Sequence, residues 1–229
     1  MQGYARRNGV LAAQEGREII TAIMTEEEKM KINLSRTKEA YYTQLNNEFD
    51  PYISCQTTSM VMGLDIAGFG LGPIKSIPNC IFSQPEDKLR WFMLNDRGIQ
   101  DFWKANCPDL SIPAPEYLGC MVCAVNYLYG DEVAYADYSL TIPKIKCDLM
   151  AGMPVYTSMA YPGNLNFAGS PAPVGGHIVL VVGIDGESLI INDPYKNHLT
   201  GERDGFNNYY HQAAFCRHNK GYGIRYKRA

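Results

Sequence analysis

The spacing of hydrophobic residues changes once along this 229-residue chain, close to residue 153. From Cys55 onward the apolar residues recur at helical spacing, and further helices are expected at 85–94, 98–106, 115–129 and 143–152. Beyond that point the apolar segments are short and rich in β-branched residues, at 154–161, 176–184 and 188–194. Because helices come first and locally paired strands second, the sequence predicts an α+β fold with an antiparallel sheet.

The last two of these strands are expected to form a β-hairpin. Asp185-Gly186 lies between them, and an Asp-Gly pair between β-branched runs is a strong hairpin signal. The chain should then finish with a helical stretch at 205–216 and a closing strand at 221–227.

The N-terminal part is expected to form a helix. Residues 9–33 carry apolar residues with many charges between them and contain no strand or turn signal, which predicts a helix. We therefore expect a helical extension over residues 1–39, followed by one domain over residues 40–229. The helix would pack on that domain or on a second copy of the chain, which predicts a helix-mediated oligomer through residues 9–33.

Charge and hydropathy exclude several classes of protein. The net charge is −3 and the isoelectric point is near 5.8, so no nucleic acid partner is expected. No apolar run reaches the roughly 18 residues that a membrane-spanning helix needs. The N-terminus lacks the apolar core of a signal peptide. The missing signal-peptide core and the odd number of cysteines, seven in all, together predict synthesis in a reducing cytoplasm.

Cys55 occupies a position that suits a nucleophile. It lies where the polar segment 40–54, expected to form a loop, ends and a helix begins. Unpaired N–H groups at a helix N-terminus stabilise a thiolate, which is the reactive form of cysteine. A buried structural cysteine is the alternative interpretation, and for Cys55 alone it is the commoner one.

His177 and Asp193 supply the partners that such a nucleophile needs. His177 begins an apolar strand after Gly175-Gly176, whereas the other histidines lie in polar C-terminal stretches. The expected hairpin brings His177 about opposite Asp193, sixteen residues later. A carboxylate beside an imidazole fixes its tautomer and stabilises its positive charge, so the pair could serve as base and orienting group.

These residues carry a family resemblance. The segments DPYISCQTTSMVM and GGHIVLVVGIDGESLIINDPY closely resemble papain-like peptidases of the bacteriocin-processing, or double-glycine peptidase, type. The resemblance covers roughly residues 40–229 and implies a papain-like fold, in which a helical lobe with the nucleophile helix packs on an antiparallel sheet. It implies Cys55 as nucleophile, His177 as base and Asp193 as the orienting residue. It also implies that Gln44 helps to bind the oxyanion, with Gln56 a poorer candidate because it would lie on the helix.

The resemblance implies a cysteine peptidase that needs neither a metal nor an organic cofactor. The leading substrate expectation is peptidoglycan stem peptides, with the chain acting at the cell wall after release as a phage-type lysis enzyme. Processing of a leader peptide or a partner protein is the alternative protease function. A catalytically silent peptide-binding module is the non-enzymatic alternative. NlpC-type peptidases and transglutaminase-like enzymes share parts of the pattern, but the Asn192-Asp193-Pro194 block favours the first family.

Two further features of the sequence are a Cys-x-x-Cys pair and a long loop before His177. Cys120-x-x-Cys123 lacks a second pair at zinc-ribbon spacing and is expected to pack in the core. The Gly- and Pro-rich loop 161–176 leads directly to His177 and is a candidate for gating substrate access.

Overall fold

The structure is a computed structural model that describes residues 30–106, 115–161, 175–196 and 202–228. Its α-helices are α2 (Cys55–Ile66), α3 (Gly72–Lys75), α4 (Pro85–Asn95), α5 (Arg97–Asn106), α6 (Leu118–Tyr129), α7 (Ile142–Met150) and α8 (Gln212–His218). Its strands are β1 (Lys31–Asn33), β2 (Ala134–Asp137), β3 (Val155–Tyr161), β4 (Gly175–Asp185), β5 (Ser188–Asn192), β6 (Asn208–His211) and β7 (Asn219–Tyr226). Two short 3-10 helices, η1 (Lys38–Ala40) and η2 (Gln44–Asn46), precede α2.

The strands of the described residues form one antiparallel sheet in the order β2-β7-β3-β4-β5-β6, and β1 pairs with β4. The hairpin expected between β4 and β5 is confirmed, since Asp185 pairs with Ser188 across a two-residue turn. Gly186 in that turn has a φ of 56°, in the left-handed region that a residue without a side chain adopts at little cost.

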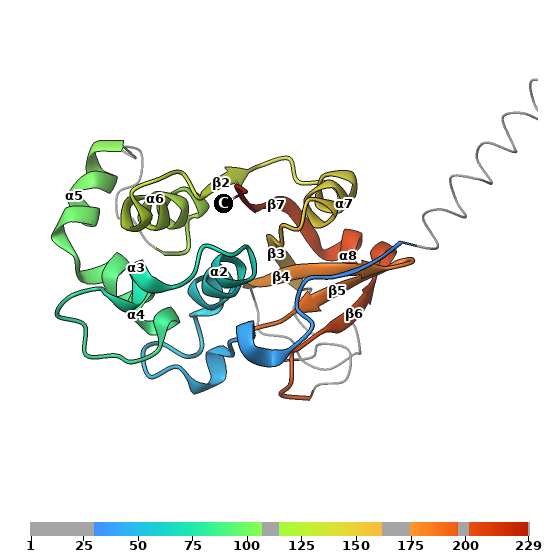
Figure 1. Ribbon diagram of the computed structural model, residues 1–229, viewed down its shortest axis with the longest axis horizontal. Coiled ribbons are helices and arrows are strands. Elements are labelled where there is room, and N and C mark those ends of the chain that lie inside the picture. Colours follow the sequence, from blue (N-terminus) through green and yellow to red (C-terminus); the bar gives the residue numbers. More distant parts are fainter. Residues whose placement is uncertain (1–29, 107–114, 162–174, 197–201, 229) are drawn as a thin grey trace, which may run out of the picture.

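Two apolar layers cover the two faces of the sheet. One layer contains helices α2, α4 and α6 with Ile178 and Leu180 of β4. The other contains α7 and α8 with Val179 and Val181 of the same strand. Figure 1 shows the helical lobe α3–α6 to one side of the sheet, α2 next to β3 and β4, and α7 and α8 at the other side. Helices and strands therefore segregate as the α+β prediction requires.

A β-bulge interrupts the alternation in β4. The pairing with β5 shifts between Val181 and Gly183, so that Ile184 joins the same layer as Val181. At Gly183 a β-carbon would lie 2.2 Å from the carbonyl oxygen of Ile32. The missing side chain therefore allows β1 to approach the end of β4.

This pairing corrects the expectation for the N-terminal segment. Residues 31–33 are not helical, because they pair with residues 183–185 of β4 as a strand. The rest of the expected helix, residues 9–29 in particular, lies outside the described residues. The oligomer through residues 9–33 and the domain boundary at residue 40 therefore stay predictions, although β1 already belongs to the sheet.

The expectation of a helix over 205–216 is wrong in its first half. Residues 208–211 form β6, which pairs with β5 and alternates buried with exposed side chains, and the helix α8 begins only at Gln212. The closing strand is confirmed and runs from Asn219 to Tyr226.

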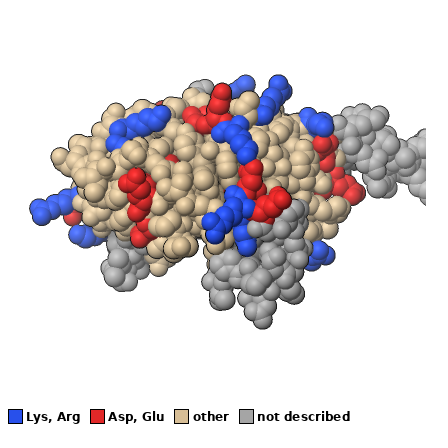
Figure 2. Space-filling model, turned by 90° about the horizontal axis from the view of Figure 1, so that it is seen from below, with Lys and Arg blue, Asp and Glu red and all other residues tan. Residues whose placement is uncertain are grey.

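The surface carries charges of both signs. On the face seen in Figure 2, Lys and Arg side chains of the described residues alternate with Asp and Glu. Among the described residues, no helix combines the length and the apolar character that crossing a membrane would require.

Candidate active site

Cys55 is the first residue of α2, as the sequence predicts. Ser54 precedes it as the N-cap residue, and the Thr58 N–H donates to the Ser54 carbonyl at 2.9 Å to close the first turn. Cys55 is buried, and its Sγ lies 3.3 Å from Oε1 of Gln56. The sulfur therefore lies at the end of the helix where backbone N–H groups and the helix dipole favour negative charge.

His177 and Asp193 are in contact. The His177 Nε2 and the Asp193 Oδ1 are 2.8 Å apart, and both residues are buried. Leu180 pairs with Asn192, so continuing this register places Asp193 opposite Val179 rather than opposite His177. The contact expected from the hairpin is therefore present, but as a diagonal pair, two residues away from direct opposition.

The environment of His177 favours its charged form. Burial alone would lower the pKa of the imidazole, but the charge of Asp193 and its hydrogen bond, together with a side-chain hydrogen bond to Cys55, outweigh burial and raise the pKa above its usual range. Because Asp193 takes Nε2, the ring nitrogen left for Cys55 is Nδ1. The imidazole is thus positioned between a carboxylate and a thiol.

The backbone of Asp193 is fixed from both sides. Its N–H donates to the Gly205 carbonyl at 2.8 Å, and its carbonyl accepts from the Tyr41 hydroxyl at 2.9 Å. Its carboxylate also accepts the N–H groups of Tyr195 at 2.8 Å and Lys196 at 3.3 Å. A β-carbon at Gly205 would lie 1.9 Å from the Asp193 carbonyl oxygen, so this close approach requires glycine.

The nucleophile helix is tied to the strand that carries the histidine. The Ser59 hydroxyl, one turn after Cys55, donates to the carbonyl of Ile178 at 3.3 Å. Ile178 follows His177 in β4. One hydrogen bond therefore joins the two elements on which the thiol and the imidazole lie.

Comparison with known proteins gives the same family as the motifs. The model of the Peptidase C39 like family matches residues 38–216, more than three quarters of the chain. The chain belongs to the peptidase C39-like family. Its fold is accordingly papain-like, and its membership supports a cysteine peptidase.

Other comparisons are more distant. A crystal structure of a candidate C39-like peptidase from Bacillus anthracis is 20% identical, with a TM-score of 0.49, and the match covers 87% of this chain and 98% of that one. At that distance the likeness adds nothing to the family assignment. No curated protein matches the chain.

In this C39-like chain, Gln44 lies between the two halves of the site. Its backbone N–H donates to the Pro194 carbonyl at 2.8 Å, next to Asp193, and its side-chain Nε2 donates to the Pro51 carbonyl at 2.8 Å. Pro51 precedes Cys55 by four residues. An amide nitrogen carries two hydrogens, so one remains after the bond to Pro51. The role of Gln44 in binding an oxyanion stays a prediction.

Helix α4 holds the loop that leads into Cys55. Asp87 accepts the N–H groups of Glu48 at 2.9 Å and Phe49 at 3.3 Å. The buried Arg90 contacts Asp50 at 3.0 Å, and Asp50 has a φ of 54°, in the left-handed region. Each contact fixes a different residue of the loop, so the loop conformation depends on α4.

Glu86 extends these contacts to the N-cap of the nucleophile helix. The side-chain amide nitrogen of Asn47 donates to Glu86 Oε1 at 3.2 Å. The amide oxygen of Asn47 accepts hydrogen bonds from the Ser54 hydroxyl at 2.8 Å and the Thr58 hydroxyl at 3.3 Å. Glu86 is buried, and its Oε2 has no hydrogen-bond partner within the part of the chain that the structure describes. Burial, with a smaller contribution from the charge of Asp87, raises the pKa of Glu86 to about 7.

Sequence reasoning did not identify this second group of residues. Glu86 and Asp87 follow Pro85 in the first turn of a helix, where acidic residues are common because of the helix dipole. Nothing in that pattern shows that they accept hydrogen bonds from a loop some forty residues earlier. The contacts become visible only once α2 and α4 are packed together.

The remaining motifs have structural outcomes. Cys120 is buried in the core and Cys123 packs against it, as expected. The described ranges contain no group of three or more His, Cys, Asp or Glu side chains that could hold a metal ion. The loop expected to gate the site lies, over residues 162–174, outside the described residues.

The raised pKa of Glu86 predicts a pH-dependent stability. The protonated carboxyl suits its buried site, so its contribution to the free energy of unfolding is fully present below the unfolded pKa of 4.5 and is lost as the pH rises through about 7. Glu86→Gln should remove this loss. We expect the variant to match the wild type near pH 4.5 and to exceed it at pH 8, by at most about 3 kcal/mol, in urea unfolding.

The matched control for this prediction is Glu48→Gln, the same change at an exposed carboxyl in the neighbouring loop. Its unfolding curves should follow those of the wild type at both pH values. A Glu86→Gln variant whose stability falls between pH 4.5 and 8 as steeply as the wild type would contradict the assignment of a neutral buried acid.

Proposed function

We propose that this chain is a cysteine peptidase that hydrolyses a peptide amide bond through an acyl-thioester intermediate. The observation that carries the proposal is the buried contact of His177 with Asp193 beside a cysteine at a helix N-terminus. Such a set has the geometry that nucleophilic catalysis requires, with a base in reach of the nucleophile and a third group that orients the base.

The first half of the reaction acylates the cysteine. The Cys55 thiolate attacks the carbonyl carbon, a C–S bond forms, and the carbonyl oxygen becomes an oxyanion. Gln44 and the Cys55 N–H are the proposed donors to that oxyanion; removing one such donor typically costs ~10²–10³ in rate. The His177 imidazolium gives its proton to the departing nitrogen as the C–N bond breaks, leaving an acyl-thioester and a free amine.

The second half restores the enzyme. His177, now neutral, takes a proton from water as the water oxygen attacks the thioester carbon. The C–S bond breaks, the carboxylic acid leaves, and the thiolate and imidazolium form again. Asp193 stabilises the imidazolium in both halves and keeps Nε2 engaged, so Nδ1 faces the reaction.

The reactivity of Cys55 tests the catalytic set. We expect iodoacetamide to alkylate Cys55 faster than any other cysteine at pH 7, because the charged His177 favours the thiolate. His177→Ala should slow alkylation of Cys55 by about tenfold or more and leave the other cysteines unchanged. Peptide mapping by mass spectrometry measures each rate in the same sample.

Exposed cysteines in the same chain serve as internal controls. Cys147 and Cys216 are accessible, so their alkylation reports on ordinary thiols. If Cys55 reacts no faster than these two in the native protein, the activated pair is absent and the silent peptide-binding module becomes the better account.

For the substrate, we propose peptidoglycan stem peptides first, with processing of a leader peptide or partner protein as the alternative. The proposal predicts that purified peptidoglycan incubated with the wild type releases stem-peptide fragments, detected by mass spectrometry, and that Cys55→Ser releases none. Cleavage of linear peptides without any cell-wall fragments would overturn the lysis function and favour processing.

A further inference from the structure

A cavity of about 310 Å³ is lined by close sequence neighbours of the proposed catalytic residues Gln44, Cys55 and Asp193. Among the described residues, its wall combines two cationic, two aromatic and two aliphatic ones: Lys196, Arg203, Tyr52, Tyr195, Leu45 and Pro51. We call this cavity the basic subsite. Its volume is at the lower end of the range for ligand sites, so it suits one or two side chains of a substrate rather than a large ligand.

Two lining residues of the basic subsite, Tyr195 and Lys196, contact the catalytic set. The Tyr195 ring packs edge-on against the His177 ring, with centroids 6.4 Å apart. The N–H groups of Tyr195 and Lys196 donate to the same Asp193 oxygen that contacts His177. The backbone that fixes Asp193 therefore also presents one wall of the cavity.

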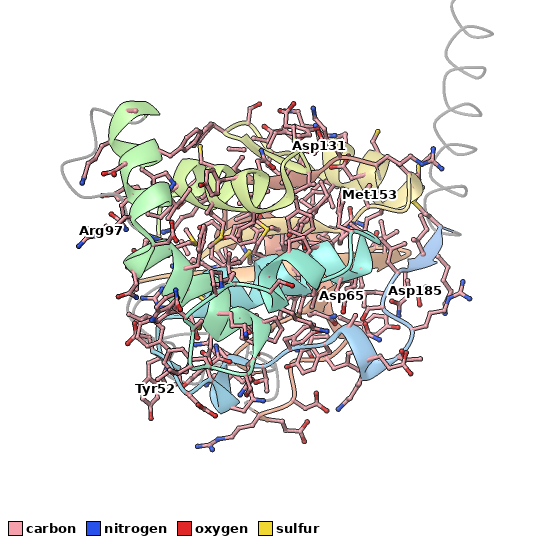
Figure 3. All side chains as sticks on the ribbon, turned by 60° about the vertical axis from the view of Figure 1, so that its left-hand side comes forward. Tyr52, Asp65, Arg97, Asp131, Met153 and Asp185 are labelled. Carbon is pink, nitrogen blue, oxygen red and sulfur yellow. The ribbon has the colours of Figure 1, made fainter. Side chains whose placement is uncertain are left out.

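Another part of the wall, Leu45, Pro51 and Tyr52, comes from the loop before the nucleophile. Leu45 follows Gln44, and the Pro51 carbonyl accepts the Gln44 side chain. Tyr52 lies three residues before Cys55 and is 83% exposed, and Figure 3 shows it at the outer edge of the molecule. A peptide whose scissile bond reaches Cys55 would therefore pass next to the cavity.

The charged residues among the described lining of the cavity, Lys196 and Arg203, are both positive. Lys196 Nζ lies 5.7 Å from the centre of the Tyr195 ring, and neither Lys196 nor Arg203 forms an ion pair with a carboxylate of the described ranges. Asp204, next to Arg203, is engaged instead by Lys38 at 2.5 Å. The two cations are thus available to an anion that enters from solvent.

We propose that the basic subsite binds the carboxylate of an acidic side chain, Asp or Glu, that flanks the scissile bond of the peptide substrate. This inference rests on the proposed function and names the substrate class that the site prefers. Lys196 and Arg203 contact the carboxylate, while Leu45 and Pro51 pack against the methylene stem of the same side chain. The C-terminal carboxylate of a short peptide has the same chemistry as an acidic side chain, and the test below distinguishes the two.

The test is a cleavage profile on a peptide library derived from a proteome digest, read by mass spectrometry. We expect Asp or Glu to be enriched at one fixed position relative to the cut. In a matched pair of peptides, replacing that Glu by Gln should lower kcat/KM about three- to tenfold, the range for two partly exposed ion pairs. If the carboxylate is terminal instead, cuts lie at a fixed distance from the peptide end and amidation of that end removes them.

A charge-reversal pair supplies the control. Lys196→Glu with Arg203→Glu should abolish the acidic preference and favour Lys or Arg at the same position. Arg97→Glu with Lys104→Glu changes the net charge equally on α5, in the helical lobe away from the sheet (Figure 1), and should keep the wild-type profile. Alkylation of Cys55 in both variants shows whether the catalytic set is intact.

The outcomes separate this inference from the proposed function. Cleavage without an acidic preference, or a preference that both double variants retain, overturns the basic subsite and leaves the peptidase standing. Preference for a terminal carboxylate overturns the side-chain form of the proposal. Absence of both cleavage and rapid Cys55 alkylation overturns the peptidase, and the subsite with it.

Discussion

The buried hydrogen bond between His177 and Asp193 is the contact on which the candidate site depends, because a charged pair out of water must be held by its surroundings. The carboxylate meets that requirement with two backbone N–H groups besides the imidazole. The backbone of Asp193 is fixed in turn by Gly205 and by the Tyr41 hydroxyl. A change at Gly205 would therefore act on the imidazole without touching it.

A second set of contacts performs the same task for the thiol. The loop before Cys55 has little regular structure of its own, and α4 supplies the missing partners through Glu86, Asp87 and Arg90. The Asp87 carboxylate accepts hydrogen bonds from the loop backbone, and Arg90 forms an ion pair with the side chain of Asp50 in the loop. Glu86 differs, because it is a buried acid whose neutral form fits the site. The geometry around the nucleophile is thus linked to protonation close to neutral pH.

Local features of the sequence were sufficient to predict the core of the site. The boundary between a polar loop and a helix located Cys55, and the hairpin located His177 near Asp193, because both depend on residues close in sequence. The turn alone would place Asp193 three residues away from direct opposition to His177. The β-bulge between Val181 and Gly183 shifts the register by one residue and leaves an offset of two, which spacing alone does not reveal.

Features that depend on distant pairing could not be predicted. Residues 31–33 follow a helical pattern, yet they pair with β4 about 150 residues later, and residues 208–211 become a strand because β5 offers an open edge. Tertiary pairing outweighs local preference in both cases. Leu45, Tyr52 and Arg203 likewise meet at one cavity only after the loop before α2 packs against the segment between β5 and β6.

The central claim is that Cys55 becomes covalently acylated during peptide cleavage. Acid quenching of the enzyme with a cleavable peptide, followed by intact-mass analysis and peptide mapping, tests it most directly. The account predicts a mass increment equal to the acyl fragment of the peptide, located on Cys55 and absent in Cys55→Ser. Peptide cleavage that persists in Cys55→Ser, or an adduct on any other cysteine, would contradict it.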